Sequence, residues 1–497
     1  MADREESSPA LPGPANIFLL TIDTLRADRL SSYGYVRNTS PNLDRLAAEG
    51  VRFDRPAVQW PKTGPSFASI FTSTYPSQNN IVRHVGIELP CEFRMLAEEL
   101  QARGYATYAV VANGAVASDF RFDQGFDRFI ETWKIDPPPA GLDPNGAEAV
   151  NLQTELLLDE IDPSQPYFLW VHYLDPHFPY EPPEAVRDRF QDDEHFDPSI
   201  KIPITDNPNQ QIVKLGRARM LDGRDELAFY EARYDAEIHY VDDQVGRLME
   251  SMEQRGLLDG TLTAFTSDHG ESLGEHLYYF DHGRFGFQTC ARVPLVLHYP
   301  EAFGPRVVDE PVGLIDLAPT LLEAAGAQLK NGVWGQGRSL VPYLFSGERA
   351  PLAPHDATAD GVLGTGADAE DAADFAAADW VAPAGMAFTE AGFASSRRWQ
   401  HWVQDARFKL VYTQAFKEQR FIGGGGQKFV LYDLESDPGE TRDVSAEHPD
   451  TVERLKRVLW RQFRAASFPV RSDAESCGGQ GEMGEETEAL LRSLGYL

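Results

Sequence analysis

The strongest constraint on the fold is a series of continuous apolar runs separated by stretches of helical pattern. The first run covers residues 16–22 and ends at Asp23. A run that is apolar at nearly every position is typical of a strand buried on both faces of a parallel sheet. Four further runs predict strands at 105–112, 167–175, 262–268 and 294–299. Strands that alternate with helices predict an α/β fold, with a mainly parallel sheet sandwiched by helices.

Changes in composition divide the chain into segments. Residues 1–15 are predicted to be a disordered leader, and residues 16–350 to form the main α/β domain. Residues 351–385 are rich in Ala, Asp and Gly and contain no Lys or Arg. This composition is typical of an acidic insertion or linker rather than of a packed core.

The C-terminal part of the chain has a different pattern. Short strand-like runs at 408–412 and 429–434 precede a helical pattern near 452–463. We therefore predict a small C-terminal α+β subdomain over residues 386–475. Residues 476–497 are predicted to be a tail that includes a short amphipathic helix.

The charge and composition of the chain exclude some classes of function. A formal net charge of −32 is opposite in sign to the basic surfaces that bind nucleic acid. No apolar run approaches the roughly 20 residues that span a bilayer, and the first residues lack the pattern of a secretory signal. The three cysteines, Cys91, Cys290 and Cys477, are widely spaced and indicate no disulfide framework. We expect a cytoplasmic protein with a small-molecule partner; its oligomeric state is not indicated.

Polar side chains follow the predicted strands at the points where these end. In open parallel sheets, ligands bind beyond the carboxyl ends of the strands. One such residue alone is usually part of a turn or a helix cap, but several together indicate a site. They are Asp23, Asn113, His172, Asp175, His177, Asp268 and His269.

Three of these residues form a candidate metal site. Asp23, Asp268 and His269 supply two carboxylates and one imidazole, a set that suits Zn²⁺ or Mn²⁺ better than Ca²⁺ or Mg²⁺, which prefer oxygen ligands. The pair Asp268–His269, followed by Gly270, also has the pattern of a simple turn, and that alternative stays open on the residues alone.

A candidate nucleophile precedes a predicted helix. Pro65 is placed for the first turn of this helix, so Thr63 lies where backbone N–H groups and the helix dipole favour an anion. The alternative role for Thr63 is that of an ordinary N-cap. Ser66 is a second hydroxyl in the same segment and competes for the nucleophilic role.

Several segments resemble, in order along the chain, the sulfatase family of the alkaline phosphatase superfamily. The run NIFLLTIDTLRAD is similar to the family's opening strand, and TGPSFASIFTS to its nucleophile segment. WVHYLDPHFPY is similar to a substrate-binding histidine segment, and TSDHGESLGEH to the second metal segment. Further matches occur at 292–295, 316–320, 337–340 and 431–438. The resemblance extends from about residue 16 to 470 and implies an alkaline phosphatase-like fold, with the catalytic domain at 16–350.

Two departures from the family pattern bear on the reaction. True sulfatases carry Cys or Ser, within Cys/Ser-x-Pro-x-Arg, for conversion to formylglycine; here Thr63 and Phe67 occupy these positions. A sulfated formylglycine hydrate can release sulfate by collapsing to an aldehyde, whereas a threonine ester requires displacement at the central atom. Phosphorus accepts such in-line attack in many enzymes. The sequence therefore favours phosphate esters, diesters in particular, as in phosphodiesterase-like and phosphonate monoester hydrolase-like members.

The resemblance also implies roles for the remaining residues. One divalent metal is expected on Asp23, Asp268, His269 and the Thr63 oxygen, with Zn²⁺ or Mn²⁺ preferred and Ca²⁺ or Mg²⁺ open. Asn113 replaces the family's lysine, and with His177 it is expected to bind the substrate oxygens.

Two more histidines complete this expected site. His282 matches the position near the leaving group and is expected to be the general acid. His172 is expected to contact the substrate or to orient a ligand.

Three functions compete. The preferred one is a metal-dependent hydrolase or transferase of phosphate esters with a covalent Thr63 intermediate. The second is a sulfuric ester hydrolase that does not rely on formylglycine. The third is a non-catalytic binding protein that retains the fold, which the presence of all three charged ligands and of a hydroxyl at position 63 disfavours.

Overall fold

The computed structural model describes residues 11–82, 87–191, 197–207, 213–345, 383–393, 398–413, 428–466 and 483–494. Residues 1–10 of the predicted leader and residues 351–382 of the predicted insertion therefore lie outside the described residues. The domain boundaries proposed from the sequence remain predictions.

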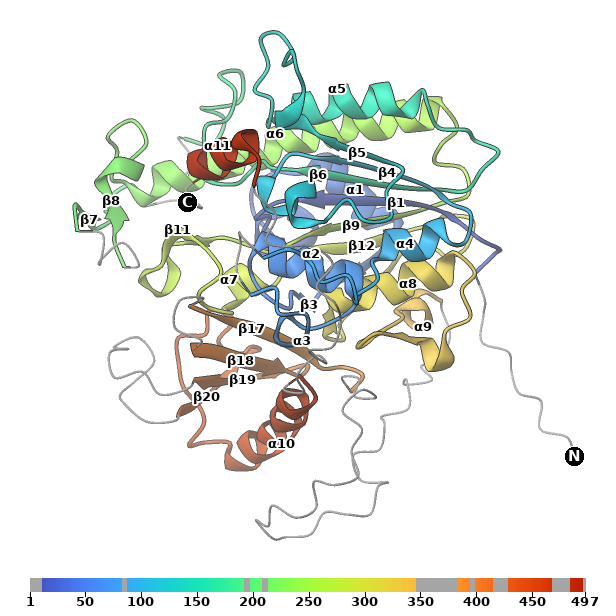
Figure 1. Ribbon diagram of the computed structural model, residues 1–497. Coiled ribbons are helices and arrows are strands. Elements are labelled where there is room, and N and C mark those ends of the chain that lie inside the picture. Colours follow the sequence, from blue (N-terminus) through green and yellow to red (C-terminus); the bar gives the residue numbers. More distant parts are fainter. Residues whose placement is uncertain are drawn as a thin grey trace, which may run out of the picture.

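An eight-stranded sheet forms the centre of the molecule (Figure 1). The order of its strands is β13 (Arg306–Val308), β2 (Val51–Phe53), β12 (Leu295–His298), β9 (Thr261–Ser267), β1 (Asn16–Ile22), β6 (Tyr167–Tyr173), β4 (Ala106–Val111) and β5 (Arg128–Glu131). Neighbouring strands are parallel except that β12 runs antiparallel to both β9 and β2. The predicted α/β class and mostly parallel sheet are confirmed.

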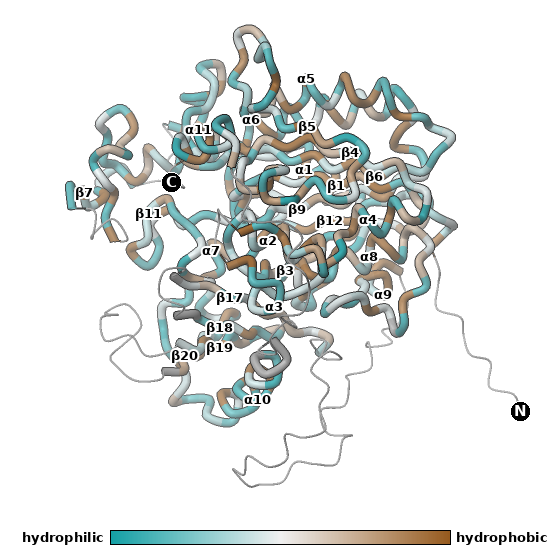
Figure 2. The backbone as a smooth tube through the Cα atoms, viewed as in Figure 1, coloured by the Kyte–Doolittle hydropathy of each residue, from teal (hydrophilic) through white to brown (hydrophobic). Residues whose placement is uncertain are grey.

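Helices cover both faces of this sheet (Figure 1). The helices α1 (Pro41–Glu49), α5 (Ala147–Leu158) and α6 (Leu227–Gln254) lie on one face, and α2 (Thr63–Thr72), α4 (Leu96–Gln101) and α8 (Leu317–Ala324) on the other. Alternate side chains of β1 pack against the helices on the two faces of the sheet, because successive residues of a strand point to opposite faces. Ile17 and Leu19 pack with α2 and α8, whereas Phe18 and Leu20 pack with α5 and α6. Figure 2 shows these strands as a hydrophobic centre.

A second, smaller sheet follows in the C-terminal part. Its antiparallel strands are β17 (Ala387–Phe393), β18 (Arg398–Gln404), β19 (Phe408–Thr413) and β20 (Lys428–Asp433). The helix α10 (Pro449–Ala466) packs against β18 and β19 (Figure 1). The helix α11 (Glu485–Ser493) returns to the large sheet, where Leu490 and Leu491 lie against Gly114. A small antiparallel C-terminal sheet is thus present, as the sequence predicted.

The remaining elements are short. The helices are α3 (Pro76–Asn79), α7 (Gln288–Ala291) and α9 (Val341–Leu344). The strands are β3 (Pro56–Ala57), β7 (Ile204–Thr205), β8 (Leu215–Gly216), β10 (Ser272–Leu273), β11 (Tyr279–Asp281), β14 (Val312–Gly313), β15 (Val333–Trp334) and β16 (Gly337–Arg338).

Two further observations bear on the sequence analysis. Among the described residues, no helix is both long enough and apolar enough to cross a membrane. Cys290 is free and buried, whereas Cys91 is disulfide-bonded, a bond that the wide spacing of the cysteines did not indicate.

Candidate active site

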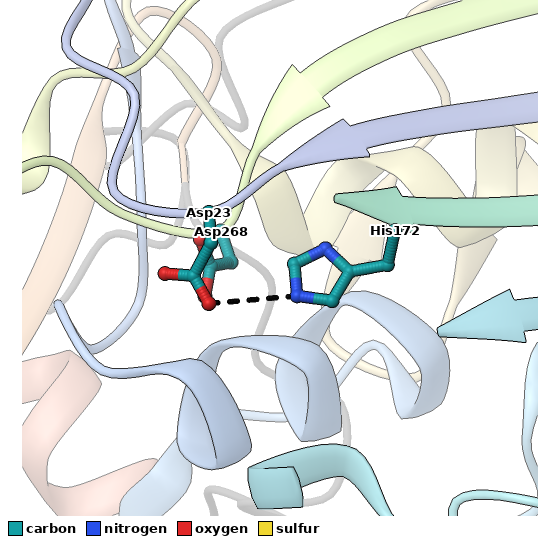
Figure 3. A group of neighbouring side chains, drawn as sticks. All are labelled: Asp23, His172 and Asp268. Atoms are coloured by element: carbon teal, nitrogen blue, oxygen red, sulfur yellow. Dashed lines mark ion pairs between the residues drawn. The ribbon is translucent and has the colours of Figure 1, made fainter. Parts of the chain in front are cut away.

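The site lies at the carboxyl ends of the central strands. Asp23 follows β1 directly, Asp268 follows β9, and His172 lies near the end of β6 (Figure 3). Because β1 pairs with both β6 and β9 in register, Thr21 lies beside His172 and Ile22 beside Ser267. This register brings Asp23, His172 and Asp268 together, with one ligand atom from each within 4.8 Å of the others.

The two carboxylates are buried and each has an unsatisfied oxygen. Asp23 and Asp268 are fully buried, and Asp23 Oδ1 and Asp268 Oδ2 accept no hydrogen bond. Burial raises the pKa of both carboxyl groups well above the ordinary value. Negative charge nearby raises each pKa further: Glu271 acts on Asp23, and Asp23 acts on Asp268. A buried negative charge without a partner is costly, so these two oxygens fit a bound cation.

His269 turns one ring nitrogen toward these carboxylates. Its Nδ1 lies 2.9 Å from the Gly270 carbonyl oxygen, to which it donates, and this leaves Nε2 as the acceptor. Nε2 lies 3.3 Å from Asp268 Oδ2 and 3.7 Å from Asp23 Oδ1. A side chain at Gly270 would meet the Thr289 carbonyl oxygen at 2.2 Å. The glycine therefore allows the close turn that orients His269.

Thr63 is the first residue of α2, and its hydroxyl faces the same nitrogen. Thr63 Oγ1 lies 3.2 Å from His269 Nε2. Lys62, not Thr63, occupies the N-cap position, and no side chain caps the helix. The N-terminus of α2 thus leaves backbone N–H groups free beside Thr63, as an anion site requires. Ser66 is occupied, because its hydroxyl donates to the Asp268 carbonyl oxygen at 2.6 Å.

Asn113 and His172 both contact Asp23 rather than an open substrate space. Asn113 Nδ2 donates to Asp23 Oδ2 at 2.5 Å, while its Oδ1 accepts from the Ala115 N–H. His172 Nε2 lies 3.5 Å from the same Oδ2 (Figure 3), and its Nδ1 lies 3.0 Å from Thr21 Oγ1. Both side chains therefore lie around one oxygen of Asp23, which leaves the other oxygen for a cation. The sequence led us to expect Asn113 on the substrate, and His172 either on the substrate or orienting a ligand. It did not indicate His172 as a metal ligand itself, which its place in the group with Asp23 and Asp268 allows.

His282 and His177 lie on the other side of His269. The rings of His269 and His282 are 4.2 Å apart between centroids, and those of His177 and His282 are 5.4 Å apart. Burial lowers the pKa of His282 to about 3, and of His177 to about 3. Burial therefore favours the neutral form of His282 when no ligand is bound. A bound anionic ester would raise its pKa.

Several residues near His282 were not identified from the sequence. Glu271 Oε1 lies 3.3 Å from His282 Nδ1, and Glu271 Oε2 has no hydrogen-bond partner. Lys62, Arg219 and Arg284 each lower the pKa of His282 electrostatically. Lys62 directly precedes the nucleophile segment, and Glu271 lies within the segment TSDHGESLGEH, so their positions offered a signal. Arg219 is distant in sequence and offered none.

Asp175 is used elsewhere in the fold. Its Oδ2 accepts from the Ala147 N–H at the start of α5 at 2.9 Å, and burial raises its pKa to about 7. The carboxyl group therefore caps the start of this helix.

Phe67 fills the position where the family pattern has arginine. Its ring lies 4.8 Å from that of His172 and 4.9 Å from that of Trp170 between centroids. All three side chains are fully buried. The Phe67 ring thus packs against His172, which itself contacts Asp23, and a guanidinium in its place would need a charged partner.

Comparisons with known proteins agree with this geometry. A family model described as Sulfatase matches residues 15–327. The chain is similar to choline-sulfatase of Rhizobium meliloti (strain 1021), with 25% identity over 97% of this chain and 93% of that protein. It is also similar to arylsulfatase A of Homo sapiens, with 29% identity over 69% of this chain and 70% of that protein.

Solved structures share the fold. One is a protein in complex with its substrate D-glucosamine-2-N,6-O-disulfate, with a TM-score of 0.67 and 20% identity over 93% of this chain and 100% of the other. Another is the phosphonate monoester hydrolase of Agrobacterium radiobacter, with a TM-score of 0.65 and 22% identity over 91% of this chain and 96% of the other.

Proposed function

Because this chain belongs to the sulfatase family, we propose that it is a metal-dependent hydrolase of phosphate esters, diesters in particular, that works through a covalent bond to Thr63. One observation supports this most directly. A single imidazole nitrogen, His269 Nε2, faces the Thr63 hydroxyl and both orphaned carboxylates. The nucleophile and the ligands are therefore gathered around one point.

The residues that would hold the metal are Asp23, Asp268, His269 and Thr63. One divalent cation fits three observations at these residues. Asp23 Oδ1 and Asp268 Oδ2 are unsatisfied, His269 Nε2 carries a lone pair directed at them, and the pKa values of both carboxyl groups are raised. The mixed oxygen and nitrogen donors suit Zn²⁺ or Mn²⁺, with Ca²⁺ and Mg²⁺ as alternatives. Such a cation lowers the pKa of a bound hydroxyl and polarises the ester.

The chain's own residues supply the remaining steps. The Thr63 hydroxyl releases its proton to solvent and its oxygen attacks the central atom in line, so that the new bond forms as the bond to the leaving alcohol oxygen breaks. The N–H groups at the start of α2 stabilise charge on the non-bridging oxygens. His282 donates a proton to the leaving alcohol oxygen, and His177 holds a substrate oxygen. Water then displaces the Thr63 oxygen and regenerates the free hydroxyl. If another alcohol takes the place of water, the same steps give transfer instead of hydrolysis.

The choice of phosphate over sulfate rests on residues 63 and 67. A threonine ester cannot collapse to an aldehyde, so its breakdown needs attack at the central atom, which phosphorus accepts. Phe67 replaces the arginine of the modification pattern and packs tightly against His172 and Trp170. Phosphonate monoester hydrolases share the fold. The second candidate is a sulfuric ester hydrolase, because sulfatases dominate the named relatives.

The test combines metal analysis with a panel of 4-nitrophenyl esters: the sulfate, the phosphate monoester, a phosphate diester and a phosphonate. We expect about one divalent metal per chain and the fastest turnover with the diester. Sulfate turnover more than about tenfold faster than that of every phosphorus ester would reverse the preference. Absence of both stoichiometric metal and any turnover would favour the binding protein.

A further inference from the structure

The side chain of Lys62 lies along the turn that carries His282. A Cβ atom added to Gly283 would lie 2.8 Å from Lys62 Cδ and 3.2 Å from Lys62 Cε. The aliphatic part of the lysine therefore runs along this turn, next to His282. Asn113 and His172 lie instead around Asp23. The side chain of Lys62 thus extends from the nucleophile toward the leaving-group histidine.

The ammonium group of Lys62 is not neutralised by a direct partner. Within the described part of the chain, it makes no hydrogen bond and no ion pair. Burial lowers the pKa of Lys62 to about 8, and the charge of Asp281 acts in the opposite direction. Acidic residues outnumber basic ones by 77 to 45 in this chain, so an ammonium group without an acidic partner is unusual here. Its position next to Thr63 in sequence suits it to bind an anionic ligand.

Two arginines flank the same histidine. Arg219, at the end of a short helix at Arg217–Arg219, donates to the Phe280 carbonyl oxygen at 2.6 Å and lies 4.5 Å above the ring of Phe178. Arg284 follows Gly283, and its Nε lies 3.7 Å from Asp281 Oδ2. Both side chains are half-buried. Three cationic side chains from separate segments therefore act on His282, together with two acids: Asp281 precedes it in sequence, and Glu271 Oε1 lies 3.3 Å from its Nδ1.

We propose that Lys62, supported by Arg219 and Arg284, forms a subsite for a second anionic group, carried on the leaving alcohol of the substrate. The inference rests on the proposed function, because it takes His282 as the group that faces the leaving oxygen. The central phosphoryl or sulfuryl group has its own partners at the start of α2 and at the carboxylate site. The positive charge beyond His282 is thus available for a different part of the same molecule.

The subsite defines a class of substrate. It fits esters of alcohols or phenols that carry a carboxylate, a sulfate or a phosphate. It disfavours a cationic alcohol such as choline, because like charges in a partly desolvated site repel. A half-buried ammonium group that meets such an anion forms a charge-assisted hydrogen bond, which is stronger than a neutral one.

The experiment compares two leaving groups of similar acidity, 4-nitrophenol and 3-carboxy-4-nitrophenol, in the ester class that the wild type turns over; a choline ester is the cationic arm. The key variant is Lys62→Met, which keeps the aliphatic contact with Gly283. Lys62→Arg preserves the charge. Lys201→Met is the matched control, since Lys201 pairs with Asp225 and Glu226 on the surface. Binding of the two free phenols, measured by calorimetry, provides a readout that needs no turnover.

We expect Lys62→Met to lower kcat/KM for the carboxylated ester about 10- to 100-fold and for the uncharged ester only about 2-fold, the range expected for a lost hydrogen bond to a charged group. Lys62→Arg should retain most of the preference, and the carboxylated phenol should bind more tightly to the wild type than to Lys62→Met.

Equal losses for the two esters, or a phenol preference that persists in Lys62→Met, would overturn the subsite. If no ester is turned over but the phenol preference depends on Lys62, the proposed function fails while the subsite stands.

Discussion

The two sides of the site are built in different ways. Asp23, Asp268 and His269 directly follow strands in the middle of the eight-stranded sheet, whereas His282 follows β11, a short strand that pairs only with β10. The first side is acidic and fixed by strand register. The second side combines the cations Lys62, Arg219 and Arg284 with the acids Glu271 and Asp281. Its position depends on what packs against the turn after His282. The comparison shows that one fold can combine a group of buried side chains fixed by strand register with a separately supported turn that carries His282.

The C-terminal sheet supports the second side. Lys409 Nζ donates to the Gly286 carbonyl oxygen at 2.6 Å and pairs with Glu440 Oε1 at 2.8 Å. The same ammonium group lies 4.6 Å from the centre of the Trp402 ring. A side chain at Gly286 would meet Trp402 Nε1 at 2.9 Å. The small sheet thus contacts the turn that leads from His282 to α7.

The largest effect should come from removing the nucleophile on the strand side. We expect Thr63→Ala to lower kcat by about 10³-fold or more, as loss of a catalytic nucleophile does, and Thr63→Ser to retain most of the activity. Ester turnover of the purified variants measures this. Ser66→Ala is the matched control, because that hydroxyl is bonded to the Asp268 carbonyl oxygen. A larger loss of activity in Ser66→Ala than in Thr63→Ala would show that Ser66, not Thr63, is the attacking hydroxyl.

Replacement of a proposed metal-binding carboxylate should reduce turnover and yet stabilise the protein when no metal is bound. Burial raises the pKa of Asp268, so its stabilising contribution is present below the ordinary value of 3.8 and is lost as the pH rises through the higher folded value. Asp268→Asn removes that charge while its oxygen can still accept from the His269 N–H. We expect turnover to fall at least about 100-fold and the Tm of metal-free protein at pH 8 to rise by about 2–4 °C.

The wild type provides the complementary measurement. A chelator should lower its Tm more at pH 8 than at pH 5, since the cation offsets charges that are present mainly at the higher pH. Asp309→Asn, on an exposed carboxylate that pairs with Arg55, serves as the control. A chelator effect that is equal at the two pH values, or a lower Tm for metal-free Asp268→Asn, would contradict the assignment of these oxygens to a cation.

The smallest effect should come from disrupting the contacts with the C-terminal sheet that support the turn after His282. The double variant Lys409→Met with Glu440→Gln leaves no buried charge unpaired, so the fold should persist. We expect kcat/KM to fall about 5- to 30-fold, because His282 loses its fixed position, while metal affinity measured by calorimetry stays within about 2-fold. Lys456→Met, on a lysine that pairs with Glu453 in α10, is the control. A matching loss of metal affinity would show that the two sides are not independent.

Sequence reasoning predicted the strand side well and the other side poorly. Asn16–Ile22 is the strand that the first apolar run predicted, and the other predicted strands differ from those observed by one or two residues at their ends. The residues after β1 and β9 are therefore correctly placed at one edge of the sheet. The short strands β2, β5 and β13 were missed, because three or four residues carry little periodic signal.

Side-chain direction was not predictable in the same way. Asn113 and His172 were correctly placed at strand ends, but the sequence does not show that both contact Asp23. The surroundings of His282 depend on Arg219 and on residues of the C-terminal sheet, which are far away in sequence. Only tertiary packing brings them together, and a pattern of local periodicity contains no information on it.

The phenyl ring at position 67 has a consequence for how the protein is obtained. Because Thr63 and Phe67 stand where the formylglycine pattern has Cys or Ser and Arg, we expect no conversion of residue 63 to formylglycine. Newly synthesised chains should then need folding, the disulfide of Cys91 and a metal ion to become competent. The specific activity of preparations from hosts with and without a formylglycine-generating enzyme should therefore be the same once their disulfide and metal content are equal.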